Sequence, residues 1–169
     1  DQAEVMKQRD EVAAALGLIA SEVGFENHKP TLVRDANVFA YVPVANLDAM
    51  AKVRVAASHW ARAFSDKGVL GVYMYTRQCV RSHSAFHARL FAPDAGVPED
   101  PATGSASIGL ARVIHHFDDL TDGTHKLQIE QGIEMGRPSA ISLAITVDRG
   151  NLIGVRIGGH VVRVAQGKL

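Results

Sequence analysis

The chain passes from loop to helix at Glu99-Asp100-Pro101-Ala102-Thr103-Gly104-Ser105-Ala106. Proline and glycine are frequent over residues 93–104, and apolar residues then recur at helical spacing over residues 105–117. Thr103 stands where an N-cap residue is expected. The stretch therefore predicts a helix over about 105–117. Because strand-like sequence lies on both sides of it, this one central helix decides the fold.

The start of this helix is a predicted anion site. The backbone N–H groups of Gly104, Ser105 and Ala106 would have no partner inside the helix, and the helix dipole adds partial positive charge there. A carboxylate or phosphate is the expected occupant, with the Ser105 hydroxyl as a further donor. Asp100 could bind a substrate amine or hydroxyl, or relay a proton. The alternative is that Glu99 or Asp100 only complements the helix dipole.

Strand-like patterns dominate the sequence around this helix. The predicted strands cover residues 19–25, 31–44, 69–76, 87–91, 127–130, 141–147, 151–157 and 160–165, the last two joined as a hairpin across Gly158-Gly159. The other predicted helices cover residues 3–16, a segment from the N-cap Asn46 to about Val53, and a turn around 60–64. Many strands with few helices indicate an α+β fold rather than a repeating βαβ fold.

Composition and charge limit the classes of function. The 169 residues include 18 basic and 18 acidic ones, so a formal net charge of zero gives no electrostatic footprint for nucleic acid or an anionic membrane. No apolar run approaches the roughly 20 residues that span a bilayer. The one cysteine, Cys79, cannot form an internal disulfide and is expected to be a packing residue. We therefore expect a cytoplasmic protein with no nucleic-acid or membrane partner.

Three blocks of sequence resemble the PhzF-like family of phenazine biosynthesis. The first joins Arg89-Leu90-Phe91-Ala92-Pro93 and Gly96-Val97-Pro98-Glu99 to Asp100-Pro101-Ala102-Thr103-Gly104-Ser105-Ala106. The second is Gln131-Gly132-Ile133-Glu134-Met135-Gly136-Arg137-Pro138-Ser139, and the third is Val155-Arg156-Ile157-Gly158-Gly159 with Gly167 beyond it. The blocks stand in the family's order, so the resemblance is strong over residues 89–169 and weak before residue 69.

The resemblance implies the fold of diaminopimelate epimerase, in which two similar halves each wrap a β-barrel around a central helix and hold the substrate between them. Residues 105–117 would be the central helix of one half. The family moves a proton at carbon without metal or organic cofactor. We therefore expect no cofactor and, as substrate, a small amino or (dihydro)aromatic carboxylic acid.

The resemblance also implies roles for residues of the helix start. By position, Asp100 matches the family's substrate-contacting aspartate and is the predicted catalytic residue. Gly104 and Ser105 match residues that hold polar groups of the substrate. The predicted substrate-binding set is Thr103, Gly104, Ser105 and Ala106.

Two features of the family do not occur in this sequence. The family's catalytic glutamate and a Gly-Asn-Pro segment belong to its N-terminal half, and neither can be located here. Since the chain begins with Asp1, we expect residues 19–169 to be the C-terminal domain, and residues 1–18 a helical arm or linker from the preceding half. We expect the isolated chain to be inactive or very slow. Its expected partner is the missing N-terminal half or a second copy in a homodimer.

Two alternatives to an enzyme stay open. One is a stand-alone module that binds small carboxylates without converting them. The other is a non-catalytic interaction protein in which the motif only caps the helix. Metal binding is not expected, because histidines such as His83 and His87 have no cysteine or carboxylate at a characteristic ligand spacing.

Overall fold

The computed structural model describes residues 3–167, and its strands form one nine-stranded sheet. The strands are β1 (Ala3–Val5), β2 (Thr31–Arg34), β3 (Val38–Pro43), β4 (Gly71–Thr76), β5 (Phe86–Ala92), β6 (Val97–Asp100), β7 (Gly123–Gln131), β8 (Ser139–Asp148) and β9 (Asn151–Gly158). The α-helices are α1 (Arg9–Ala15), α2 (Leu47–Lys52), α3 (Ala57–Ala63) and α4 (Gly104–Phe117), and short 3-10 helices cover Ala20–Glu22, Ser65–Lys67 and Pro93–Ala95. None of the helices among these residues has the length and apolar character needed to cross a membrane.

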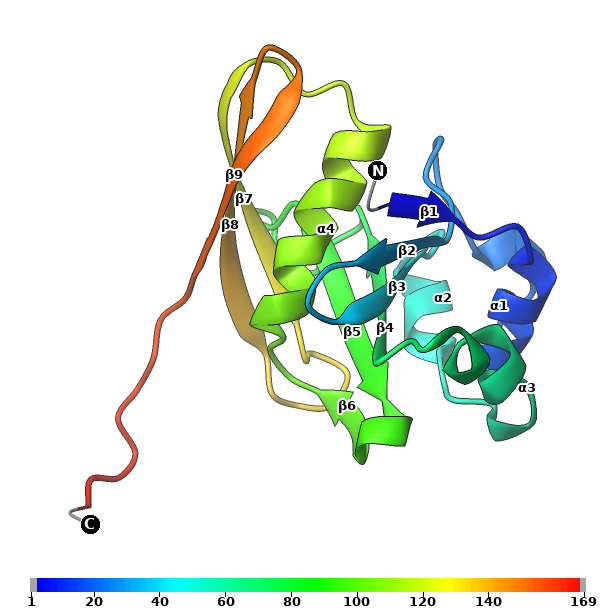
Figure 1. The fold of residues 1–169 in the computed structure, drawn as a ribbon. Helices are drawn as coiled ribbons and strands as arrows, with labels where there is room; N and C mark the ends of the chain where they lie inside the picture. Colours follow the sequence, from blue (N-terminus) through cyan, green and yellow to red (C-terminus); the bar gives the residue numbers. More distant parts are fainter. Residues whose placement is uncertain (1–2, 168–169) are drawn as a thin grey trace.

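The sheet is mixed and follows the order β1-β2-β3-β4-β5-β7-β8-β9, with β6 beside β5. Neighbouring strands are antiparallel except in the pairs β3–β4 and β5–β7. α4 contacts strands near both ends of this order, β1 to β3 and β8 to β9. The sheet is therefore curled into a half-barrel with α4 on its inner face (Figure 1). This confirms the predicted α+β class and its central helix.

Alternate residues of the central strands feed two separate cores. On β4, Val72 and Met74 belong to the core shared with α1, α2 and α3, whereas Tyr73 and Tyr75 belong to the core around α4. This division follows the two-residue period of strand side chains. Because both faces of β4 are covered, its sequence is almost continuously apolar instead of alternating between apolar and polar residues.

Close packing fixes α4 inside the half-barrel. A Cβ on Gly109 would overlap the hydroxyl of Tyr41 on β3, so the helix can approach the sheet this closely only at glycine. The Tyr41 hydroxyl donates to the backbone carbonyl of Ala106 at 2.8 Å. Tyr73 on β4 lies 3.3 Å from the Ser107 hydroxyl. The first two turns of α4 are thereby held at two points.

The N-terminal segment differs from the prediction of a helix over residues 3–16. Residues 3–5 form β1, which is antiparallel to Thr31–Val33 of β2, and α1 begins only at Arg9. The free edge of β2 offers backbone partners to residues 3–5, and such pairing outweighs a local helical pattern. α1 packs into the core through Val12 and its neighbours. The boundary between residues 1–18 and 19–169 stays a prediction, and residues 1–2 and 168–169 lie outside the described residues.

The predicted C-terminal hairpin is wrong. β9 pairs with β8 across Arg149 and Gly150, both in the left-handed backbone region, which suits a tight hairpin. Residues 159–167 form no strand and run away from the body of the fold (Figure 1). The apolar alternation of 160–165 is real, but a strand needs a neighbour to satisfy its backbone groups, and this segment has none among the described residues.

Smaller differences from the predicted elements also depend on which segments find a neighbouring strand. The predicted strand 19–25 is a 3-10 turn with two isolated bridges, and 31–44 is a hairpin of two strands instead of one. The loop 93–104 contains β6, which pairs with β5. The Asn46 cap is confirmed, because its side chain accepts from the Ala49 backbone N–H at 2.8 Å.

Candidate functional site

Hydrogen bonds fix the segment before α4, but none of them caps the first turn of this helix. Thr103 occupies the N-cap position, but its hydroxyl donates to Asp100 Oδ2 at 2.6 Å rather than accepting from the helix. Within the described residues, no side chain caps the first N–H groups of α4. These groups and the helix dipole make the start of α4 a site of positive potential.

Gln131, at the end of β7, orders this arrangement. Its Nε2 donates to the Asp100 carbonyl at 2.7 Å and to the Thr103 hydroxyl at 3.0 Å, while its Oε1 accepts from the Thr103 N–H at 3.3 Å. Since Gln131 donates to the Thr103 oxygen, the hydroxyl proton is directed to Asp100. The amide is fully buried, so the Asp100 carboxylate has a fixed orientation. Gln131 begins the second resembling block, but it is not among the site residues predicted from the sequence.

Of the two acidic residues that could complement the dipole of α4, Glu99 is bound to a positively charged side chain instead. It pairs through both oxygens with Arg89 on β5, at 2.8 and 3.0 Å. Arg89 also donates to the carbonyls of Met50 and Val53 at the end of α2. Glu99 is therefore part of a structural ion pair, whereas the Asp100 carboxylate accepts from Thr103 and has no ion-pair partner among the described residues.

A cleft of about 590 Å³ lies at this helix start. Gly104 opens into it, and a Cβ there would come within 2.8 Å of the Ile157 side chain, so glycine keeps the cleft open to the helix backbone. Arg81 also lines the cleft, and in the described part of the chain its guanidinium has no ion-pair partner. The further lining residues are Ala102, Pro138 to Ile141 and Ile157 to Val161. An arginine beside a helix N-terminus suits a carboxylate.

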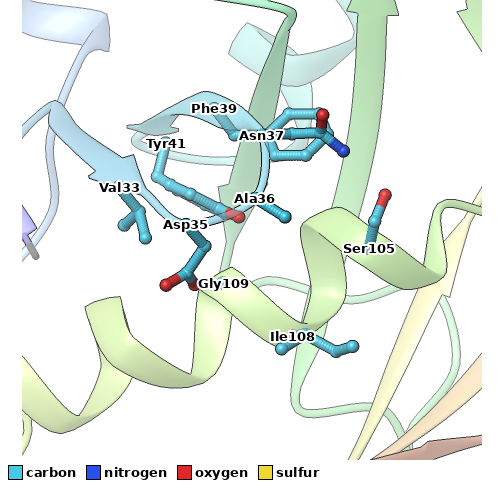
Figure 2. A pocket seen from close by; sticks show the side chains of 9 residues that line it. All are labelled: Val33, Asp35, Ala36, Asn37, Phe39, Tyr41, Ser105, Ile108 and Gly109. Carbon is cyan, nitrogen blue, oxygen red and sulfur yellow. The ribbon is translucent and has the colours of Figure 1, made fainter.

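The structure separates the residues of the predicted site. Gly104 lines the cleft, whereas Asp100 and Thr103, which are joined by a hydrogen bond, precede it in the chain and are not among the lining residues. Ser105 instead points into a smaller hollow of about 150 Å³ between α4 and the turn that joins β2 and β3, close to Asn37 (Figure 2). The Ala106 side chain is buried in the core. Neither the Ser105 nor the Ala106 side chain therefore lines the cleft.

A cluster of metal-ligand type occurs at the other end of α4. One ligand atom each of Glu26, His28 and Asp118 lie within 4.8 Å of one another. Arg77 already binds two of them, at 3.0 Å from Glu26 Oε2 and 2.6 Å from Asp118 Oδ1. Burial raises the pKa of Asp118, but hydrogen bonds from His28 and Arg77 outweigh burial and keep its pKa below the usual value. The guanidinium therefore supplies the positive charge that a metal would supply.

Cys79 is not an activated nucleophile. Burial, and then the nearby charge of Glu130, raise the pKa of its thiol to about 11. A thiolate, the reactive form, is therefore scarce at neutral pH.

Comparisons with known proteins match nearly the whole chain to one family. The family model described as phenazine biosynthesis-like protein matches residues 2–167. An uncharacterized isomerase of Mesorhizobium japonicum is 46% identical over 161 residues, which is 94% of this chain and 53% of the relative. A trans-2,3-dihydro-3-hydroxyanthranilate isomerase of Pseudomonas chlororaphis is 33% identical over 84 residues, 50% of this chain and 30% of that protein.

Solved structures show the same fold. A phenazine biosynthesis protein of the PhzF family from Bacillus anthracis superposes with a TM-score of 0.79 at 21% identity, covering 88% of this chain and 50% of that chain. A predicted epimerase from Pseudomonas aeruginosa gives 0.69 at 25% identity, covering 94% and 52%. The chain spans about half the length of the curated relatives that match nearly all of it.

Proposed function

Since this chain belongs to the PhzF-type phenazine biosynthesis-like family, we propose that it supplies one side of the active site of an isomerase or epimerase. The proposed substrate is a small amino or (dihydro)aromatic carboxylic acid, and the proposed reaction is a cofactor-independent proton transfer at carbon. A relative named trans-2,3-dihydro-3-hydroxyanthranilate isomerase supports this class of substrate.

In the proposed binding mode, the start of α4 and Arg81 bind the substrate carboxylate, and Asp100 binds its amine or hydroxyl. The substrate carboxylate lies at the start of α4, where it accepts from free backbone N–H groups and from Arg81. Asp100 accepts a hydrogen bond from the amine or hydroxyl of the substrate, or relays a proton to it. Its fixed orientation, set by Thr103 and Gln131, is the single observation that carries the proposal.

The proton-transfer base is proposed to come from outside these residues. Among the described residues, the cleft lining contains Arg81 and His160 but no aspartate or glutamate, and Asp100 precedes the lining residues Ala102 and Gly104 in the chain without lining the cleft itself. A carboxylate from a second half, corresponding to the part of the relatives that this chain does not span, would complete the acid–base pair. The same observation favours one second candidate, a stand-alone module that binds small carboxylates without converting them.

Binding of three related aromatic probes tests the site. Anthranilate carries both a carboxylate and an amine, benzoate lacks the amine, and aniline lacks the carboxylate. In NMR titrations we expect anthranilate and benzoate to shift the amide signals of Gly104 and Ser105, and aniline to leave them unchanged. We expect Asp100→Asn to weaken anthranilate about tenfold, as for one charge-assisted hydrogen bond, and to leave benzoate unaffected.

The exposed Asp119→Asn variant is the matched control and keeps full affinity for both probes. Equal effects of Asp100→Asn on anthranilate and benzoate would contradict a contact with the amine. Turnover of trans-2,3-dihydro-3-hydroxyanthranilate that appears only after adding the half of the Mesorhizobium relative that this chain does not span supports the enzyme. Binding without turnover in that mixture supports the module.

A further inference from the structure

His87 on β5 lies between two carboxylates. Its Nδ1 is 2.8 Å from Glu130 Oε1, and its Nε2 is 2.7 Å from Glu134 Oε1. The ring is 1% exposed, so water does not replace either contact. A carboxylate only accepts hydrogen bonds, and a neutral imidazole has one N–H. Both contacts are therefore hydrogen bonds only when the ring carries two protons and a positive charge.

Each of the two glutamates holds a segment that leads to residues lining the cleft. The Glu130 carboxylate accepts from the backbone N–H groups of Val80 and Arg81, at 2.6 and 3.0 Å. It thereby fixes the segment that carries the Arg81 side chain into the cleft. Glu134 belongs to the turn from Gly132 to Arg137, which the Arg137 N–H closes on the Gly132 carbonyl at 2.9 Å.

This turn also touches the helix start. A Cβ on Gly132 would come within 2.9 Å of the Pro101 carbonyl, so the turn lies directly against the residue after Asp100. Beyond the turn, Pro138 and Ser139 line the cleft. One imidazolium therefore connects three parts of the candidate site: the Arg81 segment, the turn and the loop before α4.

The charges around His87 favour the protonated ring. Glu130 faces it from β7 and Glu134 from the turn, and the Arg89 side chain on β5 lies 4.0 Å from Glu134 but is paired with Glu99. The nearby Cys79 thiol stays protonated and uncharged at neutral pH. Burial lowers the pKa of His87, but the hydrogen bonds to Glu134 and Glu130 outweigh burial and raise it above 6.5.

We propose that protonated His87 is a positioning residue that holds Arg81 and the 132–137 turn in the geometry of the anion site. The ionic bridge itself follows from the contacts of His87. The identity of the cleft as a carboxylate site rests on the proposed function.

Deprotonation of the His87 ring breaks one of its two hydrogen bonds, to Glu130 or to Glu134, and the burial of the two carboxylates decides which one breaks. The Glu130 side chain is fully buried, whereas that of Glu134 is 19% exposed and can be solvated. The neutral ring therefore keeps its proton on Nδ1 toward Glu130 and frees Glu134. A raised histidine pKa contributes stability that is complete below about 6.5 and is lost as the pH rises through the folded-state value. We expect the turn to loosen over that range.

The Glu134→Gln variant tests whether the hydrogen bonds that join His87 to residues 130 and 134 depend on the positive charge of the imidazole ring. The new amide donates to a neutral Nε2, so the bridge persists without a proton on that nitrogen. In the wild type, we expect benzoate affinity and exchange protection of the Arg137 amide, corrected for intrinsic rates, each to fall about tenfold or more as His87 titrates. In Glu134→Gln both are expected to stay constant over the same pH range. His87→Gln cannot donate to both glutamates and is expected to show the weakened state at every pH.

The exposed His83→Gln variant is the control and keeps the wild-type pH profile. Nitrogen-15 spectra of the imidazole give a direct reading, with two N–H groups expected on His87 at pH 6.5. One N–H at that pH, or a Glu134→Gln profile equal to the wild type, would overturn the proposal. If His87→Gln does not fold, Glu134→Gln decides alone. If benzoate binds neither the wild type nor any variant, the proposed function is contradicted. The imidazole spectra and the exchange protection of the Arg137 amide still test the contacts of His87 with Glu130 and Glu134.

Discussion

At the scale of the residue, small details of packing decide where the site lies. Gly104 keeps the cleft open to the helix backbone, while Gly109 lets α4 lie against Tyr41. Gln131 converts Thr103 from a helix cap into a donor that orients Asp100. The two glycines act because they have no Cβ atom, and Gln131 acts through its side-chain amide. A single substitution at each position therefore tests one effect.

Gly109→Ala tests the close approach of α4. The added methyl group would force Tyr41 to move and to lose its bond to the Ala106 carbonyl. We expect urea denaturation to show a loss of about 2–4 kcal/mol in the free energy of unfolding, from overpacking and an unsatisfied buried group. Gly158→Ala is the control, because a Cβ there meets no atom within 4 Å. Equal stabilities of the two variants would refute the packing argument.

At the scale of the element, the fold is joined by polar contacts between segments distant in sequence. Arg89 on β5 binds Glu99 on β6 and two carbonyls at the end of α2. His87, two residues earlier on the same strand, joins β7 to the following turn. β5 thus anchors both the outer helices and the loops of the cleft.

Arg89→Met is expected to cost about 3–5 kcal/mol of unfolding free energy, because it leaves Glu99 largely buried and without its counter-charge. Adding Glu99→Gln removes that uncompensated charge, so the double variant recovers part of the loss. Chemical denaturation of the wild type, both single variants and the double variant measures the coupling. Additive losses would show that the pair is not a stabilising unit.

At the scale of the whole molecule, an exposed apolar segment extends beyond β9. Val161, Val162 and Val164 are almost fully exposed and follow a strand whose outer edge is unpaired in the described region. Apolar surface of this kind tends to become an interface. We propose that a second copy of the chain covers it.

Light scattering over a concentration series tests this association. We expect a concentration-dependent dimer for the wild type, and a monomer when the three valines are replaced by serine. Val80→Ser, at an exposed valine elsewhere, is the control and keeps the dimer. A wild type that is strictly monomeric at millimolar concentration would contradict the proposal.

The sequence by itself determined the local features. The helix start at Thr103, the Asn46 cap and the buried strand β4 follow from caps and apolar periodicity, which act within a few residues. The α+β class and the central helix follow from the same signals. The same signals predict that Asp100 precedes the helix and that Gly104 lies at its start, and in the structure β6 ends at Asp100 and α4 begins at Gly104.

Only the tertiary structure decided which segments find partners. Residues 3–5 become a strand because β2 has a free edge, and 160–165 do not because no strand lies beside them. The Gln131 amide and the His87 bridge likewise depend on contacts between residues 28 to 47 positions apart. Pairing and burial at such separations carry no local signal, since the free energy comes from groups that meet only after the sheet has curled around α4.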